Sequence, residues 1–378
     1  MKKIRVALVA GKMVGGGVES LLMSISKYID KDKFTVDLLV DSDSKIVPKE
    51  EIESYGVKLI FIPPYQKIFS YLKELHILFK KNKYDIVHAN ISALNVFPLA
   101  VAYFCNIPVR ISHNHNLISP NAGKLKNFLK WVLSYFSNIF PNYRVAPTFE
   151  TGKWIFKKKP FSVIENGIDS EKFTFSLQKR QCLRNKLGVG KDEILLGSFG
   201  RMVHSKNLIV AIKVLEYLLA SSKKQYKLLL IGSGSDEYKL KKYVRTSPML
   251  KENVIFVPGQ KDISSYYSAL DVYLFPSTAE AFGIAAVEAQ TNGLITLVSK
   301  GVPSEAKILD VLFNSFDTYD INLWGNFVLN NTKTKSSIKS RNELSIEAKN
   351  IVFNSKDMVN KFEELYVNAC RKQFGRHS

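Results

Sequence analysis

Short apolar runs alternate with longer amphipathic stretches through the first 150 residues. The short runs predict strands buried on both faces, while apolar positions three or four residues apart predict helices. The predicted strands are 4–10, 34–40, 57–62, 85–89, 108–112 and 143–146, and the helices between them include 21–29, 69–81 and 124–136. This order predicts a parallel sheet with helices on both of its faces.

The same alternation begins again near residue 193. Strands are predicted at 193–198, 227–231, 254–257, 272–275 and 295–298, with a helix at 207–219. The polar stretch between the two series predicts a linker, and the tail from 346 to about 373 has a helical pattern. We therefore expect an α/β chain of two Rossmann-like, doubly wound domains at 1–167 and 191–355. A linker at 168–190 would join them, and a C-terminal helix at 356–378 would complete the first domain.

Glycines and charged residues follow several predicted strands. Doubly wound sheets bind ligands at the carboxyl ends of their strands, so these loops would converge on one cleft if the two domains face each other. The loops are Gly15-Gly16-Gly17, Gly200-Arg201 and Gly232-Ser233-Gly234. Glycine lets the backbone approach a ligand closely, although a plain turn also explains each loop. The first loop lacks the spacing of a dinucleotide fingerprint.

Two cations lie in the segment from Gly200 to Asn207, which joins a strand to a helix predicted to begin at Asn207. Arg201 and Lys206 can both point into a strand-end cleft, where two cations suit a diphosphate. A solvated basic loop is the alternative. The glutamates farther along the chain favour the ligand site.

Those glutamates are Glu280 and Glu288, which follow a predicted strand and flank Gly283. The pattern predicts a strand, a turn and a helix that begins at the glycine, with free backbone N–H groups that attract an anion. A carboxylate beside a phosphate is electrostatically costly. We therefore expect the two carboxylates to accept hydrogen bonds from hydroxyl groups, as on a sugar or a ribose.

Two histidines, His113 and His115, follow the fifth predicted strand. No Cys or carboxylate cluster accompanies them, so a metal site is disfavoured. One imidazole at the end of a strand can hydrogen-bond a substrate hydroxyl, whereas a structural role is the usual one for a single histidine.

The formal net charge of +20 suggests an anionic partner: nucleic acid, a membrane surface or a phosphorylated small molecule. The basic residues are dispersed, and no zinc-finger or RNP-like motif is present, so membrane or phosphate ranks above nucleic acid. Three scattered cysteines fit a reducing compartment. The apolar N-terminus is too short for a signal peptide and predicts a strand, and no run reaches the roughly 20 apolar residues of a membrane span.

Two stretches, 65–83 and 124–133, mix lysines with large apolar and aromatic residues. Basic amphipathic helices of this kind bind anionic membranes, although an ordinary helix with a solvated face is the alternative.

Taken in chain order, these motifs resemble the retaining GT-B glycosyltransferases of family four, over most of the chain. The matching segments are Gly16-Gly17-Val18-Glu19, the histidines, Asn166-Gly167-Ile168-Asp169, Gly200-Arg201 with Lys206-Asn207, Gly232-Ser233-Gly234, 271–277, and Glu280 with Glu288. The segments 110–116 and 152–154 look like those of the branch that builds capsular polysaccharide or exopolysaccharide.

The resemblance implies a role for each matched residue. Arg201 and Lys206 would bind the donor diphosphate, Glu280 would contact the donor sugar, and Glu288 would bind the ribose. The backbone of Ala281, Phe282, Gly283 and Ile284 would meet sugar and phosphate, as would Gly16, Gly17 and Gly234 in the glycine loops. The family's histidine would be His115 or, in the other register, His113.

The resemblance also implies an activity. The chain would transfer a hexose from a nucleotide sugar, most simply a UDP-sugar, with retention and onto a lipid-linked saccharide. No metal or other cofactor is expected, because fixed cations can stabilise the leaving diphosphate and the sequence lacks an Asp-x-Asp motif. The enzyme would work in the cytoplasm on the inner face of the membrane. A nucleotide-sugar epimerase of similar architecture is the alternative, followed by a basic nucleic-acid-binding protein.

Overall fold

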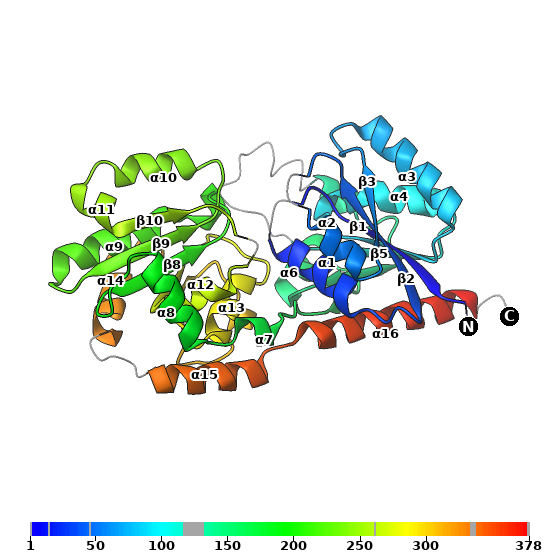
Figure 1. The fold of residues 1–378 in the computed structure, drawn as a ribbon. Coiled ribbons are helices and arrows are strands. Elements are labelled where there is room, and N and C mark those ends of the chain that lie inside the picture. The colour runs from blue at the N-terminus through cyan, green and yellow to red at the C-terminus, as the bar shows by residue number, and fades with distance from the viewer. Residues whose placement is uncertain are drawn as a thin grey trace. The chain divides into compact units, whose positions relative to one another are not determined.

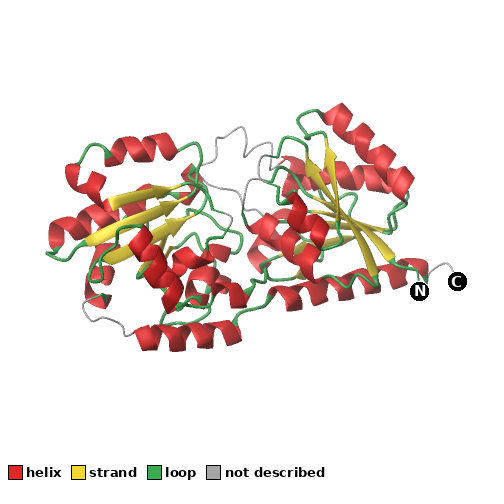
Figure 2. Ribbon diagram, in the orientation of Figure 1, coloured by secondary structure: helices red, strands yellow, loops and turns green. Residues whose placement is uncertain are grey.

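The computed structural model describes residues 2–13, 16–44, 47–115, 132–260, 262–332 and 338–375. With these gaps, the chain forms two compact units. The first unit takes in the residues up to 167 together with 353–375, and the second unit takes in 168–352. Each unit contains a parallel sheet with helices on both sides (Figure 1, Figure 2).

Within the described residues, the first sheet has the strand order β3-β2-β1-β4-β5-β6-β7, and every neighbouring pair is parallel. Its strands are β1 (Ile4–Val9), β2 (Phe34–Asp41), β3 (Lys58–Ile62), β4 (Ile86–Ala89), β5 (Val109–His113), β6 (Tyr143–Ala146) and β7 (Ser162–Val163). The helices of this unit are α1 (Gly17–Tyr28), α2 (Lys49–Ser54), α3 (Ile68–Asn82), η1 (Ser92–Asn95), α4 (Val96–Phe104), α6 (Phe149–Phe156) and α16 (Ser355–Phe374).

Alternate residues of β1 point into two different cores. Val6 and Leu8 pack with α1 and α16, whereas Ala7 and Val9 pack with α3 and α4. Both faces of the strand are therefore buried from Val6 to Val9, which explains why this part of β1 is apolar at every position rather than at every second one.

The C-terminal helix α16 closes the first unit. It lies beside α1 (Figure 1) and adds Met358, Phe362 and Tyr366, at four-residue spacing, to the core on that side of the sheet. The helical tail is interrupted at residues 352–354, so α15 (Ile338–Ile351) and α16 are separate helices.

The second sheet, within the described residues, has the order β10-β9-β8-β11-β12-β13, again with parallel neighbours. Its strands are β8 (Ile194–Phe199), β9 (Tyr226–Ile231), β10 (Val254–Val257), β11 (Val272–Phe275), β12 (Ile295–Ser299) and β13 (Phe313–Phe316). Besides α15, its helices are α7 (Ser170–Phe173), α8 (Leu177–Lys186), η2 (His204–Lys206), α9 (Ile209–Ser221), α10 (Glu237–Val244), α11 (Pro248–Asn253), α12 (Ser264–Ala269), α13 (Ile284–Thr291), η3 (Ser304–Ala306) and α14 (Ile321–Asn331).

The segment expected to be a linker, 168–190, forms α7 and α8. Phe173 and Leu183 from these helices enter a core of the second unit. Arg180 and Arg184 of α8 bind Asp271 at 2.5 and 3.0 Å, at the start of β11. The charged residues that suggested a linker thus attach this segment to the second sheet.

Two boundaries near the candidate site differ from the sequence prediction. Strand β5 continues through His113, so this histidine lies in the strand and not after it. Helix α9 begins at Ile209 and not at Asn207, because Asn207 adopts a left-handed conformation with φ of 51°. The helix predicted at 124–136 falls mostly outside the described residues.

Candidate active site

The order of strands in the second sheet reverses beside β8. The chain passes from β8 to β9 on one side and later returns to β11 on the other side. In doubly wound sheets, ligands bind where the order reverses, outside the carboxyl ends of the strands. The loops that leave β8, β9 and β11 at this edge carry most of the predicted donor-binding residues.

The loops after β8 and β9 are joined through their backbones. The Met202 N–H donates to the Ser233 carbonyl at 2.8 Å. A Cβ atom on Gly232 would lie 1.9 Å from the Gly200 carbonyl oxygen, and one on Gly234 would lie 2.3 Å from that of Met202. The two glycines therefore permit the close approach of the loops, and Gly234 supports the segment that carries Arg201.

Arg201 is exposed on the loop after β8. In the part of the chain that the structure describes, no hydrogen bond or ion pair engages its guanidinium. Lys206, at the end of η2, behaves differently. Its ammonium lies 2.5 Å from Glu280 Oε1 and 5.2 Å from the ring centroid of Phe275. The structure thus joins two residues that the sequence assigned to separate parts of a ligand.

Backbone contacts fix Glu280 in this position. Its N–H donates to the Gly301 carbonyl at 2.9 Å. Two residues earlier, the Thr278 N–H donates to the Ser205 carbonyl at 2.8 Å, next to Lys206. The Thr278–Ser205 hydrogen bond therefore joins the turn after β11 to the loop after β8, and the Glu280–Gly301 hydrogen bond joins the same turn to the loop after β12.

Gly283 allows the turn after β11 to enter α13. Its φ is 89°, in the left-handed region that favours glycine, and a Cβ atom would lie 3.0 Å from Val302 Cγ1. Phe282 buries its side chain in the core, and Ile284 begins the helix. The first turn of a helix presents N–H groups without intrahelical partners, so this end of α13 suits an anion.

Glu288 lies in α13 and is 6% exposed. The Tyr267 hydroxyl donates to its Oε2 at 2.8 Å. Burial raises the pKa of Glu288 to about 7, while the Tyr267 hydrogen bond and the charge of Lys172 act in the opposite direction. This carboxylate therefore retains an affinity for further hydrogen-bond donors.

The first sheet also reverses its strand order, between β1 and β4. Gly16 and Gly17 follow β1 and form the N-terminus of α1, with Glu19 in the first turn. Gly15 lies outside the described residues. After β4 and β5, the same edge of the sheet carries a cluster of imidazoles.

This histidine cluster consists of His88, His113 and His115. His88 Nε2 lies 3.2 Å from His113 Nδ1, and the ring centroids of His113 and His115 are 3.9 Å apart. His88 Nδ1 lies 2.7 Å from the hydroxyl of Tyr366, and His115 Nε2 lies 3.1 Å from Asn90 Oδ1.

Burial holds all three imidazoles in the neutral form. It lowers the pKa of His88 and of His115 to about 3, and it lowers that of His113 well below the usual value. His113 is fully buried, whereas His115 is 8% exposed. His115 is accordingly the member of the pair that a substrate reaches more easily.

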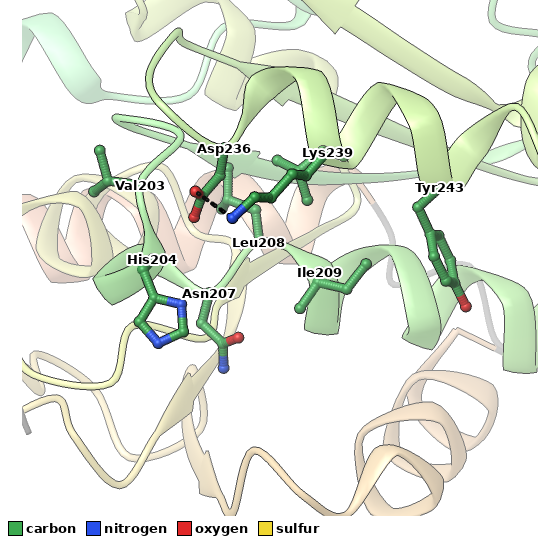
Figure 3. A pocket seen from close by; sticks show the side chains of 9 residues that line it. Val203, His204, Asn207, Leu208, Ile209, Asp236, Lys239 and Tyr243 are labelled. Carbon is green, nitrogen blue, oxygen red and sulfur yellow. Dashed lines mark ion pairs between the residues drawn. The ribbon is translucent and has the colours of Figure 1, made fainter. Parts of the chain in front are cut away.

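A separate hollow of about 320 Å³ opens between the loop before α9 and helix α10 (Figure 3). His204 and Asn207 line it from the loop, while Asp236, Lys239 and Tyr243 line it from the other side. Asp236 and Lys239 form an ion pair at 4.0 Å. None of the predicted donor-binding residues in the described chain lines this hollow, so it is distinct from the Lys206–Glu280 pair.

Sequence reasoning missed Tyr267, His88, Asn90 and Tyr366. His88 left one signal, since it is a polar residue inside an otherwise apolar strand. The contacts of Tyr267 with Glu288, of Tyr366 with His88 and of Asn90 with His115 depend on packing between segments far apart in sequence, and no local pattern marks them.

The described residues contain no group of three His, Cys, Asp or Glu side chains placed to hold a metal ion. None of the helices in the described ranges is both long and apolar enough to cross a lipid bilayer.

Comparisons with known proteins identify the family of the chain. The model for "Glycosyltransferase Family 4" matches residues 15–172, and the model for "Glycosyl transferases group 1" matches residues 179–320. One similar protein is the Escherichia coli UDP-Gal:alpha-D-GlcNAc-diphosphoundecaprenol alpha-1,3-galactosyltransferase, which is 24% identical over 97% of each chain. Another is the capsular polysaccharide biosynthesis glycosyltransferase CapM of Staphylococcus aureus, 25% identical over 71% of this chain and 75% of CapM.

The fold is also that of solved glycosyltransferases. Anabaena HepE in complex with UDP and glucose superposes with a TM-score of 0.79 at 18% identity, over 96% of this chain and 99% of HepE. The two family models follow each other along the chain and meet near residue 170, where the first unit gives way to the second. The chain therefore belongs to glycosyltransferase family four, with the GT-B fold, and to its branch of capsular and extracellular polysaccharide enzymes.

Proposed function

We propose that this glycosyltransferase moves a hexosyl residue from a UDP-sugar, with retention, onto a lipid-linked saccharide. The observation that carries the donor assignment is the Lys206–Glu280 pair, 2.5 Å apart, on the loops where the second sheet reverses its order. Arg201 and the start of α13 belong to the same loops. Cations, helix N–H groups and carboxylates on adjacent loops suit a ligand that combines a diphosphate with hydroxyl groups.

The comparisons support UDP as the nucleotide. HepE was solved with UDP and glucose, and the Escherichia coli relative is named for UDP-galactose. Breaking the anomeric bond leaves negative charge on the β-phosphate. In our proposal Arg201 and Lys206 stabilise this charge, and the N–H groups from Ala281 to Ile284 contribute to it.

The two glutamates take the hydroxyl groups in this proposal. Glu280 accepts from the donor sugar, and Glu288 accepts from the ribose. The burial of Glu288 supports its assignment, because a buried carboxylate with one hydroxyl donor gains from a second donor. Neither glutamate serves as a nucleophile. The leaving phosphate would take the acceptor proton in a front-face attack.

In the first unit, we assign His115 rather than His113 to a substrate hydroxyl, because only His115 has an exposed fraction. Gly16 and Gly17 present the N-terminus of α1 to an anionic group of the substrate.

No metal is required in this proposal, since the two cations, Arg201 and Lys206, supply the positive charge. Activity that survives treatment with EDTA would support this point, and activity restored only by a divalent ion would refute it.

The acceptor in our proposal is a saccharide on a lipid diphosphate at the cytoplasmic face of the membrane. The Escherichia coli relative is named for a diphosphoundecaprenol acceptor, and the +20 charge favours anionic partners.

Helix α3 supports peripheral binding to the membrane, because it exposes Phe69 and Ile77 together with Lys73 and Lys80. Co-sedimentation with vesicles rich in phosphatidylglycerol, and not with pure phosphatidylcholine, tests this. Replacing Phe69 and Lys73 by Ser should weaken it.

The decisive experiment is a screen for UDP release with UDP-glucose, UDP-galactose and UDP-N-acetylglucosamine, with GDP-mannose as a different nucleotide. Release from one UDP-sugar, abolished by Arg201→Ala, is the expected result. An isomerised sugar without UDP release would favour the epimerase. Tight, salt-sensitive oligonucleotide binding without affinity for UDP would favour the nucleic-acid protein.

A further inference from the structure

The histidine cluster is linked to the last helix of the chain. Tyr366 lies in α16, and its hydroxyl is 2.7 Å from His88 Nδ1. On the other side of the ring, His88 Nε2 is 3.2 Å from His113 Nδ1. Tyr366, His88 and His113 are each 0% exposed. The three side chains thus form a buried hydrogen-bonded chain that begins on α16 and ends at β5.

Proton counting leaves two arrangements for this chain of contacts. A neutral imidazole carries one proton, so each contact has a donor and an acceptor. In the first arrangement the Tyr366 hydroxyl donates to His88, His88 donates to His113, and His113 holds its proton on Nε2. In the second arrangement every contact is reversed, and His113 holds its proton on Nδ1.

The second arrangement leaves more groups without partners. His88 is the hydrogen-bond partner that the described structure gives to the Tyr366 hydroxyl. If that oxygen accepts from His88, its own proton has no acceptor. His113 Nε2 is buried and without a partner in both cases. The first arrangement thus leaves one group unpaired, the His113 Nε2–H, whereas the second leaves two, the Tyr366 hydroxyl proton and the His113 Nε2 lone pair. Because unpaired buried polar groups are costly, the first arrangement is favoured, and His113 is fixed as the Nε2–H tautomer.

Asn90 fixes the neighbouring ring in a similar way. Its amide nitrogen donates to the His88 carbonyl at 3.1 Å, so its oxygen faces His115 as an acceptor. His115 therefore carries its proton on Nε2, which leaves Nδ1 as an acceptor. The ring of His113 lies against that of His115, with centroids 3.9 Å apart. The orientation of His113 thus limits the orientation of His115.

We infer that Tyr366 and His88 are positioning residues for His115. The Tyr366 hydroxyl fixes the proton of His88, His88 fixes the tautomer and ring of His113, and His113 holds the ring of His115 in place for the substrate. This inference rests on the proposed role of His115 in hexosyl transfer. It also makes α16 part of the support for the reaction.

The test is the variant Tyr366→Phe, which removes one hydroxyl and keeps the ring that packs against Phe34 and Phe362. With histidine labelled by ¹⁵N, long-range proton–nitrogen spectra report which ring nitrogen is protonated. The chain has six histidines, so substitution of each assigns the signals. In the wild-type protein, we expect His113 to be protonated on Nε2. In Tyr366→Phe, we expect a mixture of the two neutral tautomers of His113, one protonated on Nε2 and the other on Nδ1. His113 protonated on Nδ1 in the wild-type protein would overturn the inference.

Kinetics with the UDP-sugar found by the screen supply the second readout. Tyr366→Phe should lower kcat at least about tenfold and leave KM for the donor nearly unchanged, because misplaced catalytic groups slow the reaction without weakening donor binding. The side-chain amide of His88→Gln offers an acceptor and a donor at a separation similar to that of the two imidazole nitrogens. This variant should therefore keep more activity than His88→Leu. Tyr55→Phe, which removes a surface hydrogen bond to Glu51 in the same unit, is the matched control.

The two hypotheses fail differently. If the wild-type protein turns over no nucleotide sugar, the proposed function fails, and the spectra still decide the tautomer. If the wild-type protein is active and Tyr366→Phe matches it in kcat, the positioning role is refuted while the proposed function stands.

Discussion

The ammonium of Lys206 lies 2.5 Å from the carboxylate of Glu280, and each side chain keeps part of its surface exposed, 21% for Lys206 and 15% for Glu280. A diphosphate that binds Lys206 must share this cation with Glu280 or displace it. In the proposed function, the pair would therefore set how strongly the site holds a free nucleoside diphosphate. It also links the part of the site that would bind phosphate to the part that would bind sugar.

Glu280→Gln should bind UDP more tightly than the wild-type protein and transfer sugar more slowly. Removing the carboxylate frees the charge of Lys206 for the diphosphate. Because partly exposed ion pairs contribute about 0.2–1 kcal/mol, the affinity for UDP should rise up to about fivefold. Calorimetry with UDP measures it. Glu237→Gln, which breaks the pair with Lys241 in the same unit, is the control. Weaker UDP binding by Glu280→Gln would contradict this account of the pair.

Lys206→Met should lower kcat for UDP release by about 10²–10³, the usual effect of removing one group that stabilises developing charge. Lys206→Arg keeps the charge and should retain part of the activity. Unchanged kcat in Lys206→Met would remove Lys206 from the reaction.

Gly234→Ala should weaken UDP binding by about tenfold or more. The added methyl group would lie 2.3 Å from the Met202 carbonyl oxygen, so the loop that carries Arg201 must shift. Gly190→Ala is the control. Its added Cβ atom would lie 3.4 Å from Glu193 Cγ, which is an ordinary van der Waals contact, so UDP binding should not change. Equal UDP affinities for the two variants would show that the contact between the loops does not matter.

Glu288 should make the stability of the protein depend on pH. Its pKa in the folded protein, about 7, is raised above the ordinary value of 4.5. The stabilisation from its protonated form is complete below about pH 4.5 and is lost as pH rises through about 7, with an upper limit of about 3 kcal/mol. Glu288→Gln lacks this loss, so its Tm should exceed that of the wild-type protein at pH 8 and approach it at pH 5.

Two controls accompany the Glu288 measurement. Glu252→Gln removes a carboxylate from an exposed position and should leave the pH profile of Tm unchanged. Tyr267→Phe removes the hydrogen bond that favours the charged form, so it should extend the loss of stability to higher pH. If Glu288→Gln shows the wild-type profile of Tm against pH, the carboxylate is not the source of the effect.

Arg341→Met should destabilise the second unit. Arg341 is 8% exposed and donates to the carbonyls of Tyr267, Leu270 and Asn292 at 2.5–3.2 Å, at the C-terminal ends of α12 and α13. Leaving these buried acceptors unpaired costs about 3 kcal/mol. Lys349→Met, in the same helix as Arg341, removes a partly exposed ion pair with Glu171 of α7 and should cost less than about 1 kcal/mol. Similar Tm values for the two variants would contradict this role.

Much of the fold follows from local pattern. Apolar runs such as 4–10 and 227–231 predict strands because both of their faces are buried, and the observed strands agree within one or two residues. The strands that were missed, β7 and β13, are at sheet edges and carry no continuous apolar run. Helix α8 was missed because few of its residues are apolar and its arginines bind Asp271.

The candidate site was predictable where it depends on neighbours in sequence. Gly283 marks the start of α13, which places Glu288 in the second turn of the helix and leaves Glu280 in the turn before it. The pairing of Glu280 with Lys206 was not predictable, because it depends on how two loops from different strands meet. The same holds for Tyr267 beside Glu288 and for Tyr366 beside His88.

The docking of α16 on α1 has a consequence for synthesis of the protein. A ribosome completes residues 168–352 before it makes α16, so the second unit has all of its chain while the first still lacks a helix. Until Met358, Phe362 and Tyr366 emerge, the apolar face formed by Val6, Leu8 and α1 has no cover. The first unit thus completes its core only after the chain of the second unit has been made.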